Sequence, residues 1–368
     1  MHGVFPASSS SGGAANQLPS QKSRGDSLLN NRRMWMNVGS VGLLFAVLLI
    51  IWVVVNKIKN LEGLSASPTT TLSIPPTRQK STSIIETPII DTPMVTSQVE
   101  TLITSTALPA RIDSIDGQMV LVPAGSFSMG GNADDALREC NKLIPDPQNS
   151  CTGDQFFDEE RIHEVKLDSF YIDVYEVTNA RYLECVDAGV CDAPAGKTSN
   201  SRPNLPVVNI TWLMARRYCE AWRNARLQFE AEWEKAARGK NETLYPWGSD
   251  FDGTMANFCD VNCVKEWKNG AYDDGYSELA PIGSYKANGY GIYDMAGNAQ
   301  EWVQDWYSPS YYNNSPSENP EGPDFGDRRV IRGGSWFNGG DSLRTSRRFS
   351  ESPDYYSDSI GFRCSYSP

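Results

Sequence analysis

Residues 288–302 read NGYGIYDMAGNAQEW, a stretch in which glycines, asparagines and aromatic residues take the place of any regular pattern. The chain keeps this character from Arg238 until a closing strand that we predict at 360–364. Aromatic residues make up 11% of the chain, ten of them are tryptophans, and most lie after position 160. Large rings fill the irregular gaps of a compact fold rich in loops. We therefore expect an α+β, irregular and loop-rich domain.

Regular elements are predicted mainly in the part of the chain that precedes this stretch. Alternating apolar residues indicate strands, and apolar residues three or four apart indicate helices. These patterns predict strands within 119–130 and 165–172 and helices over 180–188, 211–223 and 230–238. Either Thr178 or Asn179 is placed to cap the first helix. Together these segments predict one domain over 117–368, long enough to bury a substantial core.

All eight cysteines follow residue 139. Three neighbouring pairs enclose short loops, and the two remaining cysteines are left for a long-range bridge. The predicted pairs are Cys140–Cys151, Cys185–Cys191, Cys259–Cys263 and Cys219–Cys364. An even count with local pairing indicates disulfides in an oxidising compartment. The chain has no C-x-x-C pair and only two histidines, which argues against zinc and against metal sites built on several imidazoles.

A run of 23 uncharged residues at 34–56 predicts a transmembrane helix. Trp35 and Trp52 lie near its ends, where interfacial rings are favoured. A cleavable signal peptide is the alternative, but the apolar run is too long, starts too late and lacks a small-x-small exit. Four basic residues precede the run and two follow it, which favours a cytoplasmic N-terminus. We expect a single-pass cell-membrane protein with a disordered cytoplasmic segment at 1–33 and an extracytoplasmic C-terminal domain.

The segment 57–116 is predicted to be a disordered stalk. Its central part is dominated by Ser, Thr and Pro, as in PTTT at 68–71, and it shows neither helical nor alternating spacing. Such a segment buries too little apolar surface to offset the entropy of ordering. Prolines extend it, and it serves either as a plain spacer or as an O-glycosylated one.

The predicted domain is strongly acidic. From residue 117 onward there are 24 Lys and Arg against 38 Asp and Glu, within a chain of net charge −12. A domain of this charge repels phosphate backbones, so we do not expect nucleic acid as a partner. The excess carboxylates have two interpretations, a solvated acidic surface or a set that partly holds hard cations such as calcium.

Several short motifs follow one another along 117–368. They are VPAG (122–125), FSMG (127–130), EVTN (176–179), PVVNITW (206–212), EAEWE (230–234), AARG (236–239), YPWG (245–248), NGYGIYDMAGN (288–298), EW (301–302), RGGSW (332–336) and GFRC (361–364). In this order they resemble the formylglycine-generating enzyme, or sulfatase-modifying factor, family. The resemblance implies a variant of the C-type-lectin-like fold. It also implies a disulfide between a helix cysteine and a last-strand cysteine, which supports Cys219–Cys364.

The resemblance further implies two structural calcium sites. The first comprises the side chains of Asn257 and Asp274 and the carbonyls of Phe258 and Tyr276. The second comprises the side chains of Asp294 and Glu301 and the carbonyls of Met295, Gly297 and Ala299. Calcium takes six to eight oxygens from such a mixture of carboxylates and carbonyls. The alternative is that Asp294 and Glu301 only cap turns through backbone N–H groups.

The resemblance stops at the chemistry. The family's enzymes oxidise a substrate cysteine to formylglycine with a copper(I)-binding cysteine pair that follows the Gly-Gly-Ser motif, and soft thiolates suit copper(I). Here the first position is Asn338, the second falls near Leu343, and no cysteine lies between Cys263 and Cys364. We therefore expect no copper and a non-catalytic module. The alternative is a formylglycine-generating oxidase, or a related oxidoreductase, acting on a protein or a small molecule.

In the catalytic relatives the residues after this motif face the substrate. The corresponding pocket residues here are Ser335, Trp336, Asn338, Arg344 and Arg347, followed by Arg348. Arginines and a tryptophan in one groove suit a peptide, a protein or an anionic glycan. Alternatively, Trp336 belongs to the core and the arginines pair with acids such as Asp341 and Glu351. A purely structural surface protein, the third possibility, would have no pocket around Ser335 and Asn338.

Overall fold

The structure is a computed structural model that describes residues 108–114, 117–144, 151–196 and 202–368. These residues belong to one unit, which spans Val99–Pro368. The predicted cytoplasmic segment, the predicted membrane span at 34–56 and the stalk as far as residue 107 lie outside the described residues. Within the described ranges, no helix has both the length and the apolar character needed to cross a membrane.

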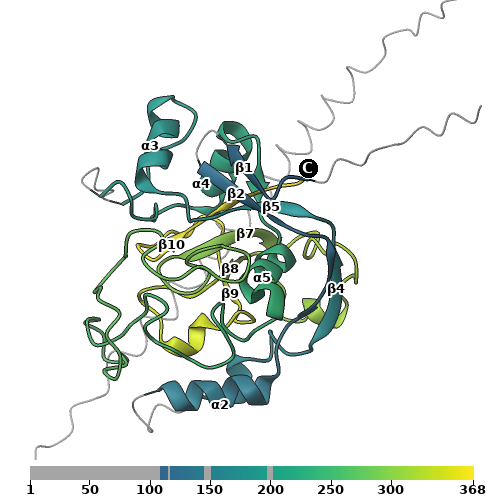
Figure 1. Cartoon of the computed structure of the whole chain (residues 1–368), viewed down its shortest axis with the longest axis vertical. Helices are drawn as coiled ribbons and strands as arrows, with labels where there is room; N and C mark the ends of the chain where they lie inside the picture. The colour runs from purple at the N-terminus through teal and green to yellow at the C-terminus, as the bar shows by residue number, and fades with distance from the viewer. Residues whose placement is uncertain (1–107, 115–116, 145–150, 197–201) are drawn as a thin grey trace, which may run out of the picture. The chain divides into compact units, whose positions relative to one another are not determined.

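Strands form three small sheets (Figure 1). The largest has the order β1 (Arg111–Ser114), β2 (Gly117–Val122), β5 (Phe170–Asp173), β11 (Cys364–Tyr366), β6 (Arg226–Leu227), and its neighbours are antiparallel. The second has the order β10 (Ile360–Gly361), β7 (Gln300–Trp306), β8 (Arg329–Arg332), β9 (Phe349–Glu351). The third pairs β3 (Gly125–Met129) with β4 (His163–Leu167).

Helices lie around these sheets, with α2 and α3 at opposite ends of the view in Figure 1. The helices are α2 (Ala133–Leu143), α3 (Asn179–Asp187), α4 (Trp212–Arg217), which continues into a π-helical turn at Tyr218–Trp222, and α5 (Glu230–Arg238). Short 3₁₀ turns occupy Gly153–Gln155, Gly239–Asn241, Tyr311–Asn313 and Gly340–Leu343. Long irregular segments connect these elements, which confirms the expected α+β, loop-rich fold.

Several predicted elements need correction. The strand expected over 165–172 is divided into β4 and β5, which belong to different sheets. The break occurs at Asp168, whose backbone N–H donates to Asn319 Oδ1 while Asn319 Nδ2 donates to the Asp168 carboxylate. These bonds replace the ladder contacts that a continuous strand would make. By contrast, α5 has the predicted bounds, and Thr178 caps α3 by accepting a hydrogen bond from the Arg181 N–H.

Both ends of the domain also differ from the prediction. The expected stalk included residues 111–114, but these form β1 and pair with β2 from Arg111↔Val120 to Ser114↔Gly117. The folded part therefore begins before residue 117. The closing strand predicted at 360–364 is two short strands, β10 and β11, because Phe362 and Arg363 between them turn into the core.

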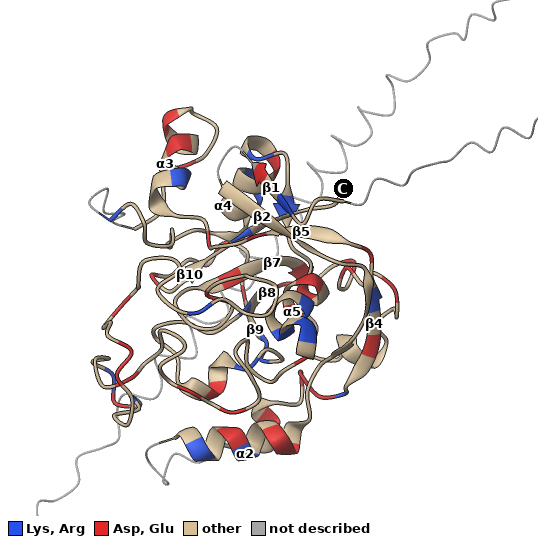
Figure 2. Ribbon diagram, in the orientation of Figure 1, with Lys and Arg blue, Asp and Glu red and all other residues tan. Residues whose placement is uncertain are grey.

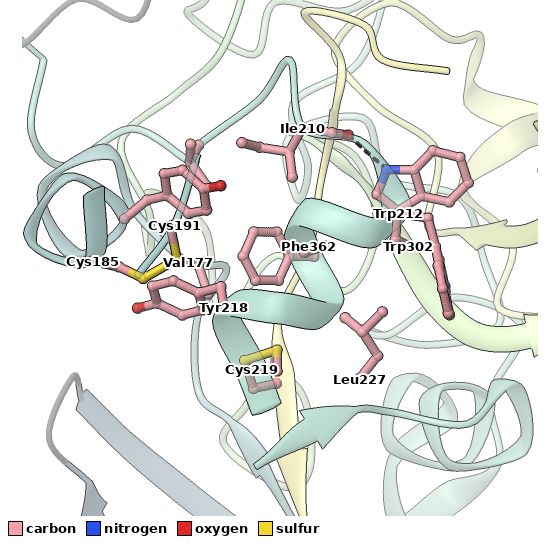
Figure 3. Close-up of a cluster of buried hydrophobic side chains, with 14 of the residues drawn as sticks. Val177, Cys185, Cys191, Ile210, Trp212, Tyr218, Cys219, Leu227, Trp302 and Phe362 are labelled. Carbon is pink, nitrogen blue, oxygen red and sulfur yellow. Dashed lines mark hydrogen bonds between the residues drawn. A yellow bond between two sulfur atoms is a disulfide. The ribbon is translucent and has the colours of Figure 1, made fainter. Parts of the chain in front are cut away.

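One of the two large hydrophobic clusters of the domain holds two of the four disulfides (Figure 3). Tyr218 packs against Tyr182 and Phe362, and the Trp302 indole N–H donates to the Ile210 carbonyl at 2.9 Å. Cys185–Cys191 and Cys219–Cys364 lie in this cluster, and Cys140–Cys151 and Cys259–Cys263 lie elsewhere. All four predicted pairings are confirmed, and no cysteine is free in the described part of the chain, which contains all eight.

Candidate functional site

A cavity of about 420 Å³ lies against the β10-β7-β8-β9 sheet. All four strands contribute to its lining. The lining comprises residues 336–338, 349–351, Tyr355 and 357–360, with Lys265, Gln300 and Ile331. We call this cavity the groove. The segment after the Gly-Gly-Ser motif therefore does border a pocket, as the sequence predicted.

Three of the predicted pocket residues meet at the groove. Trp336 and Asn338 line it. Ser335 is fully buried beneath it and donates its hydroxyl to Asn338 Oδ1 at 2.8 Å, which fixes the orientation of that amide. The Trp336 indole N–H donates to the Asp358 carbonyl at 3.1 Å, so this ring connects two segments of the wall. Trp336 is only 8% exposed and is thus both a core residue and a lining residue.

The arginines predicted for the pocket do not line the groove. Arg344 is buried and donates two hydrogen bonds to the Glu159 carboxylate, at 2.6 and 2.7 Å, and Arg347 lies 3.6 Å from the same group. Burial opposes ionisation of Glu159, but Arg344 outweighs it and lowers the pKa of this carboxyl below its usual value. The interpretation in which the arginines pair with acids is thus closer to the structure, with Glu159 as the ion-pair partner. Arg344 also donates to the Asp341 carbonyl at 3.2 Å, whereas Glu351 pairs with Arg328.

Further buried ion pairs connect α5 to the C-terminal strip. Arg348 donates to both carboxylate oxygens of Glu230, at 2.7 and 2.9 Å, and Arg332 pairs with Glu234. Figure 2 shows acidic and basic residues side by side on α5. These side chains are almost completely buried, so removal of one partner would leave an uncompensated charge in the core. The basic run is therefore structural.

The two positions that correspond to the copper-binding cysteines lie in different surroundings. Asn338 faces the groove, whereas Leu343 is buried in a cluster with Tyr245 and Phe258. Because every cysteine of the described part is in a disulfide, the groove presents no thiolate. A linear two-sulfur copper(I) site has no ligands here.

The residues implied for the first calcium site fit a hard cation. Asn257 is fully buried and its Oδ1 atom has no hydrogen-bond partner, while its Nδ2 donates to the Glu278 carbonyl and to Asn298 Oδ1. The Asp274 carboxylate accepts from the N–H groups of Phe258 and Tyr276, both at 2.8 Å. Burial raises the pKa of Asp274 to about 7. An unpaired buried amide oxygen, and a carboxylate whose ionised form is disfavoured by burial and which is bonded to the next residue's N–H, are the kinds of group a calcium ion would satisfy.

The second implied site has an excess of buried negative charge. Asp294, Glu301 and Glu176 are buried together and share one guanidinium, that of Arg363. Glu301 accepts from Arg363 at 2.7 and 2.9 Å, which is more than the capping of a turn, whereas Asp294 accepts from the Gly283 N–H at 2.7 Å. Burial raises the pKa of Asp294 to about 6 and that of Glu176 well above its usual value.

Glu176 was absent from the predicted ligand set, although it lies in a motif that the sequence interpretation quoted. Its carboxylate accepts from Asn298 Nδ2 and from the Ala299 N–H, each at 3.0 Å. Among the described residues, no group of three or more His, Cys, Asp or Glu side chains is arranged to hold a metal by itself. A cation at the second site would therefore depend on backbone carbonyls, which the resemblance assigns to Met295, Gly297 and Ala299.

A disulfide-closed loop that the sequence interpretation did not assign to the site contacts the groove wall, and Lys265, which follows it, lines the groove. The loop is closed by Cys259–Cys263, and the Cys259 N–H donates to the Asn338 carbonyl at 2.9 Å. The Trp267 indole N–H donates to the Phe337 carbonyl at 3.1 Å, and Lys265 Nζ lies 4.8 Å from the centre of the Phe337 ring. In the sequence, the only sign of these contacts was the short spacing of Cys259 and Cys263, with Trp267 four residues further on.

Comparison with known proteins agrees with the fold and the motifs. The family model for the sulfatase-modifying factor enzyme 1-like domain matches residues 106–367, a start that agrees with β1. The chain is 34% identical to the formylglycine-generating enzyme of Streptomyces coelicolor over 303 residues, which cover 69% of this chain and 90% of that protein. It is 37% identical over 183 residues to the inactive C-alpha-formylglycine-generating enzyme 2 of Mus musculus, covering 47% of this chain and 54% of the murine protein.

A solved structure with a similar fold is PvdO from Pseudomonas aeruginosa. The TM-score is 0.54 and the sequence identity 27%, over 71% of this chain and 99% of PvdO. The order of motifs, the loop-rich sheets and the family match over most of the chain lead to one assignment. The chain belongs to the sulfatase-modifying factor family, whose domain it carries over residues 106–367.

Proposed function

We propose that this chain is a non-catalytic member of its family that binds a peptide, protein or glycan through the groove. The observation that carries the proposal is the state of the cysteines, since all eight are in disulfides and the first copper-ligand position is Asn338. The second position, Leu343, is part of a hydrophobic cluster. Oxidation of a substrate cysteine by the family's copper chemistry needs thiolates that this groove lacks. The murine relative is itself described as inactive.

The proposal includes a cellular location for the domain, outside the cell membrane. The uncharged run at 34–56 would anchor the chain in the cell membrane, with residues 1–33 in the cytoplasm and the stalk holding the domain outside. Four disulfides support this side of the membrane, because structural disulfides persist in oxidising compartments.

Two calcium ions would complete the fold of this module. The first would be held by Asn257 and Asp274 with neighbouring carbonyls, and the second by Asp294 and Glu301. When bound, calcium supplies positive charge to buried carboxylates and joins loops that no sheet organises. Contacts within the chain already orient these carboxylates. Arg363 pairs with Glu301, and backbone N–H groups donate to Asp274 and Asp294.

The test of non-catalytic status is direct. The purified full chain in detergent is incubated with copper(I), oxygen and a Cys-x-Pro-x-Arg peptide, and the peptide is examined by mass spectrometry for an aldehyde. We expect none. Conversion of the cysteine to formylglycine would overturn the proposal and establish the oxidase alternative.

A matched variant makes a negative result informative. Asn338→Cys combined with Leu343→Cys restores the two thiols at the family's positions, and Asn338→Ala with Leu343→Ala is its control. We expect only the cysteine variant to bind copper(I) in a titration with a chromogenic competitor, because only it offers two soft ligands. Copper(I) binding by the unmodified chain at one equivalent would count against the proposal.

A further inference from the structure

Exposed apolar side chains gather beside the groove. Eleven large hydrophobic residues are exposed among those that the structure describes, and five of them fall in two short segments. These five are Val261, Val264, Trp267, Tyr355 and Tyr356. The first segment contains the lining residue Lys265, and the second contains the lining residue Tyr355. The other six are spread from Leu108 to Tyr366, so this concentration marks a contact surface rather than ordinary exposure.

Of the open rings, Tyr355 lines the groove, whereas Trp267 and Tyr356 lie outside its lining. Trp267, Tyr355 and Tyr356 are 47%, 45% and 47% exposed. Trp267 is held by its hydrogen bond to the Phe337 carbonyl and by an edge-to-face contact with the Phe337 ring at 5.2 Å. A small-molecule site encloses most of its ligand and places its rings within the cavity. Rigid rings on a rim suit a broad partner surface instead.

Two of the rings that line the groove are already engaged. Trp336 is 8% exposed and its indole N–H is engaged by the Asp358 carbonyl, and the Lys265 ammonium lies near the Phe337 ring, 4.8 Å from its centre. Tyr355 also lines the groove and is 45% exposed, so the open aromatic face of this site lies at the rim. The composition of the segments around the rim, described next, is what favours a protein partner.

The segments that surround the rings have the composition of an antibody binding surface. Residues 350–359 read SESPDYYSDS, and 337–341 read FNGGD. Residues 352–358 form no helix or strand. Tyrosines supply large contact area with little loss of side-chain entropy, and Ser, Gly and Asn supply adaptable hydrogen bonds. Such a surface binds folded proteins without a preformed deep pocket.

Charge indicates the chemistry of the partner. Four acidic residues, Glu266, Glu351, Asp354 and Asp358, and two basic ones, Lys265 and Lys268, lie in the two segments that contain the rings. The arginines that would have favoured an anionic ligand are instead buried against Glu159 and Glu230. Glu351 lies 3.7 Å from the exposed Arg328, which leaves Glu266, Asp354 and Asp358 against the two lysines. Electrostatic complementarity therefore favours a basic contact.

We infer that the groove and its rim, formed by Val264, Trp267, Tyr355 and Tyr356, dock a folded protein whose contacting patch is basic. This inference rests on the proposed binding function and names the partner class for that site. The rim rings supply the apolar centre of the contact, and the exposed Asp354 and Asp358 supply the charged part.

The first experiment locates the contact. The full chain, produced in cells of its natural host, carries the photo-cross-linking residue p-benzoylphenylalanine at Tyr356 or, as a control, at Phe325, which is 84% exposed and does not line the groove. We expect a protein adduct from position 356 and none from position 325. Equal adducts from both positions, or no protein adduct at 356, would refute the inference.

The second experiment measures what the rim contributes. The captured protein is purified and titrated against the full chain in detergent. We expect Tyr355→Ala with Tyr356→Ala to weaken binding about tenfold or more, and Phe325→Ala to leave it unchanged. Asp354→Asn with Asp358→Asn is expected to weaken binding severalfold and to reduce its dependence on salt. An affinity that none of these substitutions changes would show that the captured protein docks elsewhere.

A separate measurement distinguishes the failure of this inference from failure of the proposed function. Binding of the full chain to an array of neutral oligosaccharides, lost with Tyr355→Ala and Tyr356→Ala, would replace the protein partner by a glycan and keep the binding function. Formation of an aldehyde in the copper assay would remove the binding function itself.

Discussion

Removal of the Cys219–Cys364 disulfide tests how the domain is held together. The two cysteines are 145 positions apart, whereas Cys259 and Cys263 are 4 apart. In the chain-entropy model a disulfide stabilises the fold by restricting the unfolded chain, and the effect grows with the logarithm of loop length. The model gives about 5 kcal/mol for the long loop and about 2 kcal/mol for the short one.

The comparison between these two bridges isolates loop length. All four cysteines are almost completely buried, so replacing either pair by alanine removes similar packing. We expect Cys219→Ala with Cys364→Ala to lose about 3 kcal/mol more free energy of unfolding than Cys259→Ala with Cys263→Ala. Urea unfolding of the full chain in detergent, followed by tryptophan fluorescence, measures both. Equal losses in the two variants would refute the reasoning, since they would show that local packing and not chain entropy determines the effect.

Three further predictions concern buried polar groups. Arg344→Met should lower the free energy of unfolding by about 3–5 kcal/mol in urea titrations, because Glu159 would lose its bidentate partner in the core, and a loss near zero would contradict this. Burial and the neighbouring Glu230 raise the pKa of Asp305 well above its usual value, so the folded state binds this proton more tightly and the contribution of Asp305 to stability falls as pH rises above about 4. Asp305→Asn should therefore become progressively more stable relative to the unmodified chain as pH rises, in thermal melts across that range, and a constant difference would contradict it. Asn257→Ala removes the unpaired oxygen and should reduce calcium binding from two ions to one in isothermal titration, whereas unchanged stoichiometry would place the ion elsewhere.

The disulfides and α5 were predictable because their signals are local. Short cysteine spacings identify three bridges, and the fourth follows by elimination. The helix Glu230–Arg238 combines apolar spacing with acidic residues in its first turn and basic residues in its last. Both predictions use only neighbouring residues, so they do not depend on which distant segments come into contact.

The arginines were not predictable for the opposite reason. Arg344 lies next to the candidate groove in sequence, but its partner Glu159 is 185 positions away. The strand β7 was missed because its residues are buried on both faces, which removes the alternation that marks a half-exposed strand. The rim of the groove was missed because Trp267 and its partner Phe337 are 70 positions apart in the sequence.

The distribution of stabilising contacts explains how this scaffold can exist without the family's cysteine pair. Neither residue 338 nor residue 343 takes part in the strongest of these contacts. They are the Cys219–Cys364 disulfide and the ion pairs Arg344–Glu159 and Arg363–Glu301. At position 338 the asparagine now forms a link, since its side chain accepts from Ser335 and its carbonyl accepts from the Cys259 N–H. The position that would hold a copper ligand therefore connects the Gly-Gly-Ser turn to the disulfide-closed loop. Under the proposed binding function, this link would hold the groove wall in one conformation, and a preorganised surface loses less entropy when a partner docks.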